Sequence, residues 1–144
     1  MALASHRPMS VGIVAVMLMG AACSANLPAA RPSGAVVRVS ERDFHISAPD
    51  QLSAGDVVLS VTNRGPEAHE LIVVRSTDSQ LPLRADAVTV DEEALAAAKS
   101  GALEPAQAGS VRTLRVHLAS GRYVLFCNMA GHYMGGMQAV VVVP

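Results

Sequence analysis

The sequence predicts an all-β protein, a β-sandwich of about seven to eight short strands. From Ala35 onward, short segments of alternating apolar and polar residues are separated by turn-forming stretches such as Asn63-Arg64-Gly65-Pro66. Hydrophobic residues make up 51% of the chain but include only two Phe, two Tyr and no Trp, so Val, Leu, Ile and Ala must form most of the core. At 144 residues there is room for one domain and an export segment.

The alternation also indicates which side chains face the core. In the segment 43–47, Phe44 and Ile46 are expected on the buried face, while His45 lies on the polar face. His117 is expected on the polar face of a later strand, opposite Leu114, Val116 and Leu118. Strands are predicted at 35–40, 43–47, 56–62, 69–75, 111–118, 123–127 and 139–143.

Residues 76–109 break this pattern and predict a long crossover that contains one short helix. Thr89 or Asp91 offers an N-cap, good helix formers follow as far as Lys99, and Gly101 is placed to end the helix. The acidic residues 91–93 would lie in the first helical turn, where the helix dipole favours them, and no fourth oxygen donor completes a calcium loop. We therefore interpret the acidic cluster as structural. Whether the crossover also covers the side of the domain that carries residues 127–137 stays open.

The N-terminal part has the features of an export signal and a tether. Residues 1–22 combine a modestly basic start with a short apolar run and small residues before Cys23, which resembles a bacterial lipoprotein signal. Cleavage after Ala25 is the alternative. Residues 23–34 contain Pro and Ser and predict a flexible tether, so the folded domain is expected at 35–144.

Charge and cysteine content exclude some classes of function. The net charge is −1 and neither sign forms a long block, so nothing indicates a nucleic-acid partner. Cys23 and Cys127 are the two cysteines, and we expect them to have different roles, with lipidation for the first. A membrane is expected to be a partner only through this N-terminal lipid.

The most informative stretch is the loop from Cys127 to Met137, which reads Cys-x4-His-x4-Met with His132 in the middle. Apolar runs enter and leave it, and its glycines allow the backbone to bend so that the three side chains converge. Each residue alone would be interpreted as core or surface. Together, a thiolate, an imidazole and a thioether form the ligand mix that suits copper.

A fourth donor must come from elsewhere, and His69 is the best candidate. It opens a strand just after the Gly65-Pro66 turn, where a side chain can point into the end of a sandwich. Met129 and Met134 flank the loop and could compete with Met137 for the weak axial position. Met137 is preferred because it immediately precedes the final strand.

The set of a separated His69 and the Cys-x4-His-x4-Met loop resembles the cupredoxins, the blue copper proteins, with a loop spacing similar to sulfocyanin, rusticyanin and auracyanin. The resemblance implies a Greek-key β-sandwich that holds one copper ion through His69, Cys127, His132 and Met137. The ion would cycle between Cu(II) and Cu(I). It also makes the amide of Glu70, where the family commonly has Asn, a candidate donor to the cysteine sulfur.

The resemblance further implies an electron carrier rather than an enzyme. Copper oxidases would need more histidines, including His-x-His pairs, and a binuclear electron-transfer centre would need a second Cys in the loop; this sequence has neither. Electrons would pass through the edge of His132 to redox proteins of unknown identity. The patch around it is expected to contain Gly65, Pro66, Gly131, Tyr133 and Met134.

Two alternatives remain. One is an extracytoplasmic copper carrier or storage protein that uses the same ligands. The other is an interaction module without metal, in which Cys127 and Met137 belong to the core. The preferred interpretation is an exported protein, periplasmic or at the cell surface, anchored by a lipid on Cys23.

Overall fold

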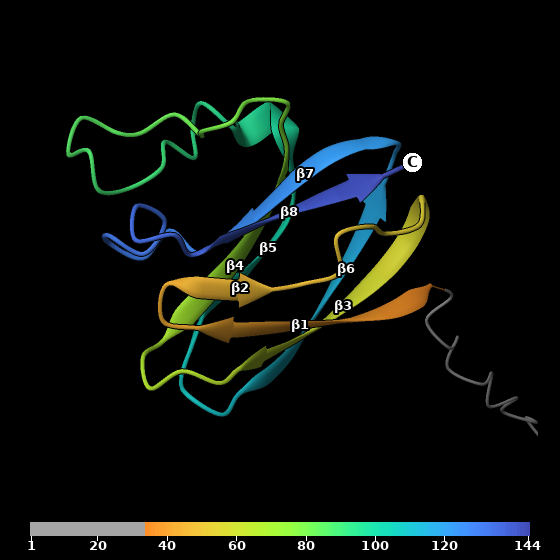
Figure 1. Ribbon diagram of the computed structural model, residues 1–144, viewed down its shortest axis with the longest axis horizontal. Helices are drawn as coiled ribbons and strands as arrows, with labels where there is room; N and C mark the ends of the chain where they lie inside the picture. Colours follow the sequence, from red (N-terminus) through yellow and green to blue (C-terminus); the bar gives the residue numbers. More distant parts are fainter. Residues whose placement is uncertain (1–33) are drawn as a thin grey trace, which may run out of the picture.

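The computed structural model describes residues 34–144, which fold into two β-sheets packed face to face (Figure 1). The predicted export signal, Cys23 and the tether up to residue 33 lie outside the described residues. Within residues 34–144, no helix is long and apolar enough to cross a membrane. The strands are β1 (Ala35–Arg42), β2 (His45–Ser47), β3 (Gly55–Asn63), β4 (His69–Arg75), β5 (Lys99–Ala106), β6 (Val111–Leu118), β7 (Gly121–Phe126) and β8 (Gln138–Val143).

The two sheets each contain four of these strands. Their orders are β2-β1-β3-β6 and β5-β4-β7-β8. β1 pairs with β3 in parallel, and the other strand pairs are antiparallel. The chain crosses between the sheets after β3, β5 and β6, so the predicted β-sandwich class is confirmed.

The main core lies between the sheets, and the alternation of the strands explains it. Leu114, Val116 and Leu118 of β6 are buried there, as predicted, whereas His117 is exposed. The prediction for Phe44 was wrong. It lies in the turn between β1 and β2 with a φ of 60°, outside the strand, and its side chain is 52% exposed.

β4 and β7 are buried on both faces along their central parts, which explains the apolar runs 71–74 and 123–126. Leu71 and Val73 point into the main core, while Ile72 and Val74 join a second cluster on the outer side of the sheet. Side chains from the crossover, including Leu81, complete this second cluster. The crossover therefore covers the outer face of this sheet.

The helix predicted in the crossover was wrong. The side chain of Asp91 does accept hydrogen bonds from the amides of Glu93 and Ala94, at 3.1 and 3.2 Å. However, the turn continues only as the 3₁₀ turn η1 (Ala96–Ala98). Gly101 lies inside β5, paired with Val73 of β4. Pairing with the open edge of β4 satisfies a row of backbone groups, and this tertiary gain outweighs the helix propensity of a short segment.

One end of the sandwich gathers the segments that the sequence analysis singled out. The β1–β2 turn, the β3–β4 turn and the loop 127–137 all lie there (Figure 1). The crossover reaches the same loop. The amide of Gly131 donates to the carbonyl of Val88 at 3.0 Å, and the amide of Val90 donates to the Asn128 side chain at 2.6 Å.

Candidate metal centre

The loop between β7 and β8 folds back so that its ends meet. The amide of Cys127 donates to the carbonyl of Met137 at 3.2 Å, and the amide of Met137 donates to the carbonyl of His132 at 2.9 Å. Gly131 and Gly136 have φ values of 79° and 99°, in the left-handed region that glycine adopts without strain. These turns place Cys127, His132 and Met137 close together at the end of two rigid strands.

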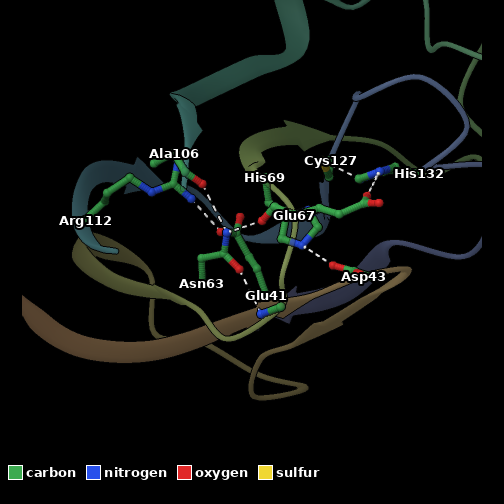
Figure 2. A network of polar contacts seen from close by, with 10 residues as sticks. Glu41, Asp43, Asn63, Glu67, His69, Ala106, Arg112, Cys127 and His132 are labelled. Atoms are coloured by element: carbon green, nitrogen blue, oxygen red, sulfur yellow. Dashed lines mark hydrogen bonds and ion pairs between the residues drawn. The ribbon is translucent and has the colours of Figure 1, made fainter. Parts of the chain in front are cut away.

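His69, the first residue of β4, joins the loop from the neighbouring strand. One ligand atom each from His69, Cys127 and His132 lies within 4.8 Å of the others (Figure 2). The Cys127 Sγ is 3.5 Å from Nδ1 of His132, and the two imidazole centroids are 5.2 Å apart. The side chains are buried, with exposed fractions of 0% for His69 and Cys127 and 7% for His132. The structure therefore brings these three predicted residues together.

Each imidazole makes a hydrogen bond to a carboxylate on its outer side. Nε2 of His69 lies 3.0 Å from Oδ1 of Asp43, and Nε2 of His132 lies 3.1 Å from Oε2 of Glu67 (Figure 2). An ionised carboxylate only accepts, so Nε2 must carry the proton in both rings. In a neutral ring Nδ1 then carries no proton and can only accept, and in His132 it lies 3.5 Å from the Cys127 sulfur. Neither carboxylate was identified from the sequence.

These contacts provide a test of whether the residues fit a metal ion. Nδ1 of His69 is buried and has no hydrogen-bond partner among the described residues. A buried acceptor without a partner is costly, and a bound cation removes that cost. Metal-binding histidines typically donate their other N–H to a carboxylate or carbonyl. Two imidazoles and a thiolate are the strong donors of blue copper centres, so the residues fit a copper ion.

The β3–β4 turn that presents His69 is held by the buried side chain of Asn63. Its amide donates to the carbonyls of Glu67 and Ala106, at 2.7 and 3.0 Å. Its oxygen accepts from the amide of Gly65 at 2.9 Å. The turn is therefore tied both to itself and to β5.

Burial shifts the pKa values of two members of the cluster. Burial raises the pKa of the Cys127 thiol, although hydrogen bonds from the amides of Glu70 and Met129 partly oppose it. Burial lowers the pKa of His69, against the opposing hydrogen bond to Asp43. The imidazole is thus kept neutral, and a metal ion would displace the proton of the thiol. The amide of Glu70 lies where the resemblance implied a donor, and its side chain accepts from the amide of Asn128 at 3.1 Å.

The three methionines near the loop differ in burial. Met137 is fully buried and belongs to the same core cluster as Cys127. Met129 is partly buried against that cluster, and Met134 is 55% exposed. Burial beside the cysteine favours Met137 as the axial donor, and this role stays a prediction.

The patch expected around His132 is only partly at the surface. Pro66 and Met134 are exposed and Gly131 is half-buried, but Gly65 and Tyr133 are buried, so placing these two in the patch was wrong. Tyr133 packs edge-to-face on Phe126, and its hydroxyl accepts from the amide of Leu81 at 2.8 Å. We expected this ring at the surface because the sequence does not show that the crossover covers it.

Two residues that the sequence analysis missed lie over His132 instead. The ring of Phe44 makes an edge contact with the imidazole, with centroids 5.4 Å apart. The side chain of Glu67 is 58% exposed and lies at the outer nitrogen of the ring. The face of the protein near His132 therefore combines an aromatic ring with a carboxylate.

No protein-family model matches the sequence, and no curated protein matches it. Among solved structures, the chain is similar to the dithionite-reduced auracyanin of Roseiflexus castenholzii, with 21% identity and a TM-score of 0.58 over 77% of this chain and 99% of that one. It is also similar to auracyanin A of Chloroflexus aurantiacus, described as a "blue" copper protein, with 20% identity and a TM-score of 0.58 over 78% and 100%. An azurin of Methylomonas sp. strain J follows with 15% identity and a TM-score of 0.54 over 76% and 98%. The chain thus has the cupredoxin fold.

Proposed function

We propose that the protein is a mononuclear blue copper protein that carries electrons outside the cytoplasm. The observation that supports this most directly is the buried cluster of His69, Cys127 and His132, whose ligand atoms lie within 4.8 Å of one another. The cluster lies at one end of a fold shared with a "blue" copper protein. Fold alone does not specify function, so the proposal depends on the site.

In this proposal the Nδ1 atoms of both histidines and the sulfur of Cys127 would hold the ion, and Met137 would be a weaker fourth donor. Copper would supply one-electron chemistry between Cu(II) and Cu(I). His69 opens β4, Cys127 follows β7 and Met137 precedes β8. A backbone hydrogen bond ties Met137 to His132 in the loop, so the donors need not move when the charge changes. Burial of all three side chains leaves no evident room for a substrate, which favours a carrier over an enzyme.

The N-terminal features support the cellular part of the proposal. A signal at 1–22 would export the chain, and a lipid on Cys23 would keep the domain at a membrane surface through the tether. Periplasmic or cell-surface redox proteins would then be the partners. Mass spectrometry of the mature N-terminus distinguishes lipidated Cys23 from cleavage after Ala25.

A copper carrier or storage protein with the same ligands is the competing function. The two functions differ in what the protein does with the ion. We expect rapid, reversible one-electron reduction in voltammetry and slow loss of copper to an apo-protein acceptor. Rapid transfer of copper to the acceptor, with no reversible wave, would favour the carrier or storage function.

Replacing Met137 by Leu tests the axial donor. Leu has a similar volume and stays apolar, so the core should be disturbed by less than about 1.5 kcal/mol. We expect the visible thiolate-to-copper band to persist and the reduction potential to rise, because a donor that favours oxidised copper is lost. Met134→Leu, at an exposed position, is the control. An unchanged potential in Met137→Leu would contradict the axial assignment.

Replacing Glu67 by Gln tests electron exchange through the His132 edge. The change removes a negative charge at Nε2 of His132 but keeps an acceptor oxygen. At low ionic strength, and with the rates compared at equal driving force, we expect oxidation by the anion ferricyanide to become faster, and exchange with the cation hexaammineruthenium slower, each by up to about 5-fold. Added salt should reduce both differences.

Asp56→Asn is the matched control for this measurement. It removes one carboxylate that also pairs with a histidine, His117, at the opposite end of β3. It should leave both rates nearly unchanged. Equal effects of Asp56→Asn and Glu67→Gln would show that only total charge matters and would contradict exchange at His132.

A further inference from the structure

The turn between β1 and β2 makes three contacts with the metal centre. Asp43 binds the outer nitrogen of His69 at 3.0 Å, and the ring of Phe44 lies against His132. Phe44 also covers Gly135, where an added Cβ would overlap its ring. No metal ligand lies in this turn, yet it touches both histidines and the ligand loop.

The backbone of the turn is strained in a way that places these side chains. Phe44 has a φ of 60°, a value that a bulky residue rarely adopts. Such strain persists only where surrounding contacts hold it, and it is concentrated at functional sites. Here the strained residue directly follows Asp43, and both side chains point toward the centre (Figure 2 shows Asp43 beside His69).

The turn between β3 and β4, which contains Gly65, leaves space for the contact between Asp43 and His69. A Cβ on Gly65 would lie 2.5 Å from Oδ1 of Asp43 and 2.9 Å from Nε2 of His69. Any side chain at position 65 would therefore push the two apart. Gly65, which was expected at the surface, is buried beneath this contact instead.

We propose that Asp43 is a positioning residue of the metal centre, holding the N–H of His69 so that the bare Nδ1 faces the ion. This inference rests on the proposed copper function. A carboxylate on the outer nitrogen fixes the tautomer and the orientation of the ring and makes it a stronger donor. Its negative charge also favours the oxidised over the reduced ion. Asp43 suits this role because its partner is fully buried and its own side chain is only 24% exposed.

The metal-free protein gives the first test. Nitrogen-15 NMR of the wild type should show the His69 proton on Nε2, protected from exchange with solvent, and Nδ1 unprotonated. In Asp43→Ala that protection should be lost. A proton on Nδ1 in the wild type, or unchanged protection in Asp43→Ala, would overturn the inference.

Copper binding gives the second test, using competition with a chromogenic Cu(I) chelator and a potential measured by voltammetry. Asp43→Ala and Gly65→Ala should each bind copper about 10- to 100-fold more weakly. Asp43→Asn, which keeps an acceptor oxygen but loses the charge, should regain most of the affinity and show a raised potential. A purely structural role would not move the potential in this variant. Asp56→Asn, which loses a similar Asp–His contact far from the centre, should behave as the wild type.

The outcomes separate the two proposals. A wild type that binds no copper overturns both. A wild type that binds copper, together with a folded Asp43→Ala of equal affinity and an Asp43→Asn of equal potential, overturns the positioning role alone. If Asp43→Ala does not fold, Asp43→Asn and the wild-type NMR spectrum still decide the question.

Discussion

We expect Cys127→Ser and Cys127→Ala to lose the visible thiolate-to-copper band of the proposed site completely. Their affinity for copper should fall by at least about 100-fold, because loss of an outer hydrogen bond alone costs up to about that much. The reason is that the sulfur is the only thiolate among the described residues that the cluster can offer. In the proposed site the band would arise from charge transfer between this sulfur and the ion, so no other donor could replace it. Absorption spectra during copper titration measure both effects.

The two variants control for each other. Cys127 is 0% exposed, so the Ser hydroxyl would be buried in an apolar cluster and is expected to destabilise the fold by about 1–3 kcal/mol. Ala introduces no polar group and leaves only a small cavity. A coloured Cys127→Ala would contradict the assignment, whereas a colourless, folded Cys127→Ala supports it regardless of what Ser does to stability.

The second large effect concerns stability, and we expect Arg112→Ala to lower the free energy of unfolding by about 3–5 kcal/mol. Arg112 binds the carboxylate of Glu41 at 2.5 Å, and Glu41 is fully buried (Figure 2). Removing one partner leaves the other buried without compensation. Urea denaturation of the metal-free protein measures the loss.

The double variant Glu41→Leu with Arg112→Met is the control. Replacing both partners by apolar side chains is often nearly neutral, so most of the lost stability should return. Measuring the single variants Glu41→Leu and Arg112→Met as well completes a double-mutant cycle, which isolates the pair from the packing of each side chain. A double variant as unstable as Arg112→Ala would mean that packing, rather than the unpaired carboxylate, causes the loss.

The pH dependence of this pair has a definite sign. Burial raises the pKa of Glu41 from 4.5 to about 7, although the charge and hydrogen bond of Arg112 act in the opposite direction. Between these values the folded protein keeps a proton that the unfolded chain has released. The contribution of Glu41 to the free energy of unfolding is therefore fully present below about pH 4.5 and is lost as the pH rises through about 7. Glu41→Gln should lack this slope, and the deficit of Arg112→Ala should be larger at pH 8 than at pH 5.

The sequence was sufficient for most of the strands and for the loop that carries most of the site. Alternation located β6, and the bounds predicted for β4 agree with those observed. The Cys-x4-His-x4-Met spacing is local information, since a glycine-containing loop between two strands must bring its own ends together. His69 could be proposed because its strand and turn are also local features.

The features that the sequence did not predict depend on contacts between segments that are far apart in the chain. Asp43 meets His69 across 26 residues and Glu67 meets His132 across 65, and no spacing rule predicts either pair. β5 was missed because its pairing with β4, rather than its own sequence, makes it a strand. Phe44 alternates correctly with Ile46, but the turn lies at residues 43–44, two residues later than the predicted gap at 41–42, so the ring lies over the metal centre.

The central claim is that one copper ion is bound by the sulfur of Cys127 and the imidazoles of His69 and His132. Copper K-edge X-ray absorption of the wild-type protein with one equivalent of copper tests it most directly. We predict one short sulfur neighbour and two imidazole nitrogens, with one imidazole lost in His69→Gly. A shell of nitrogen and oxygen alone, or a shell that His69→Gly leaves unchanged, would contradict the account.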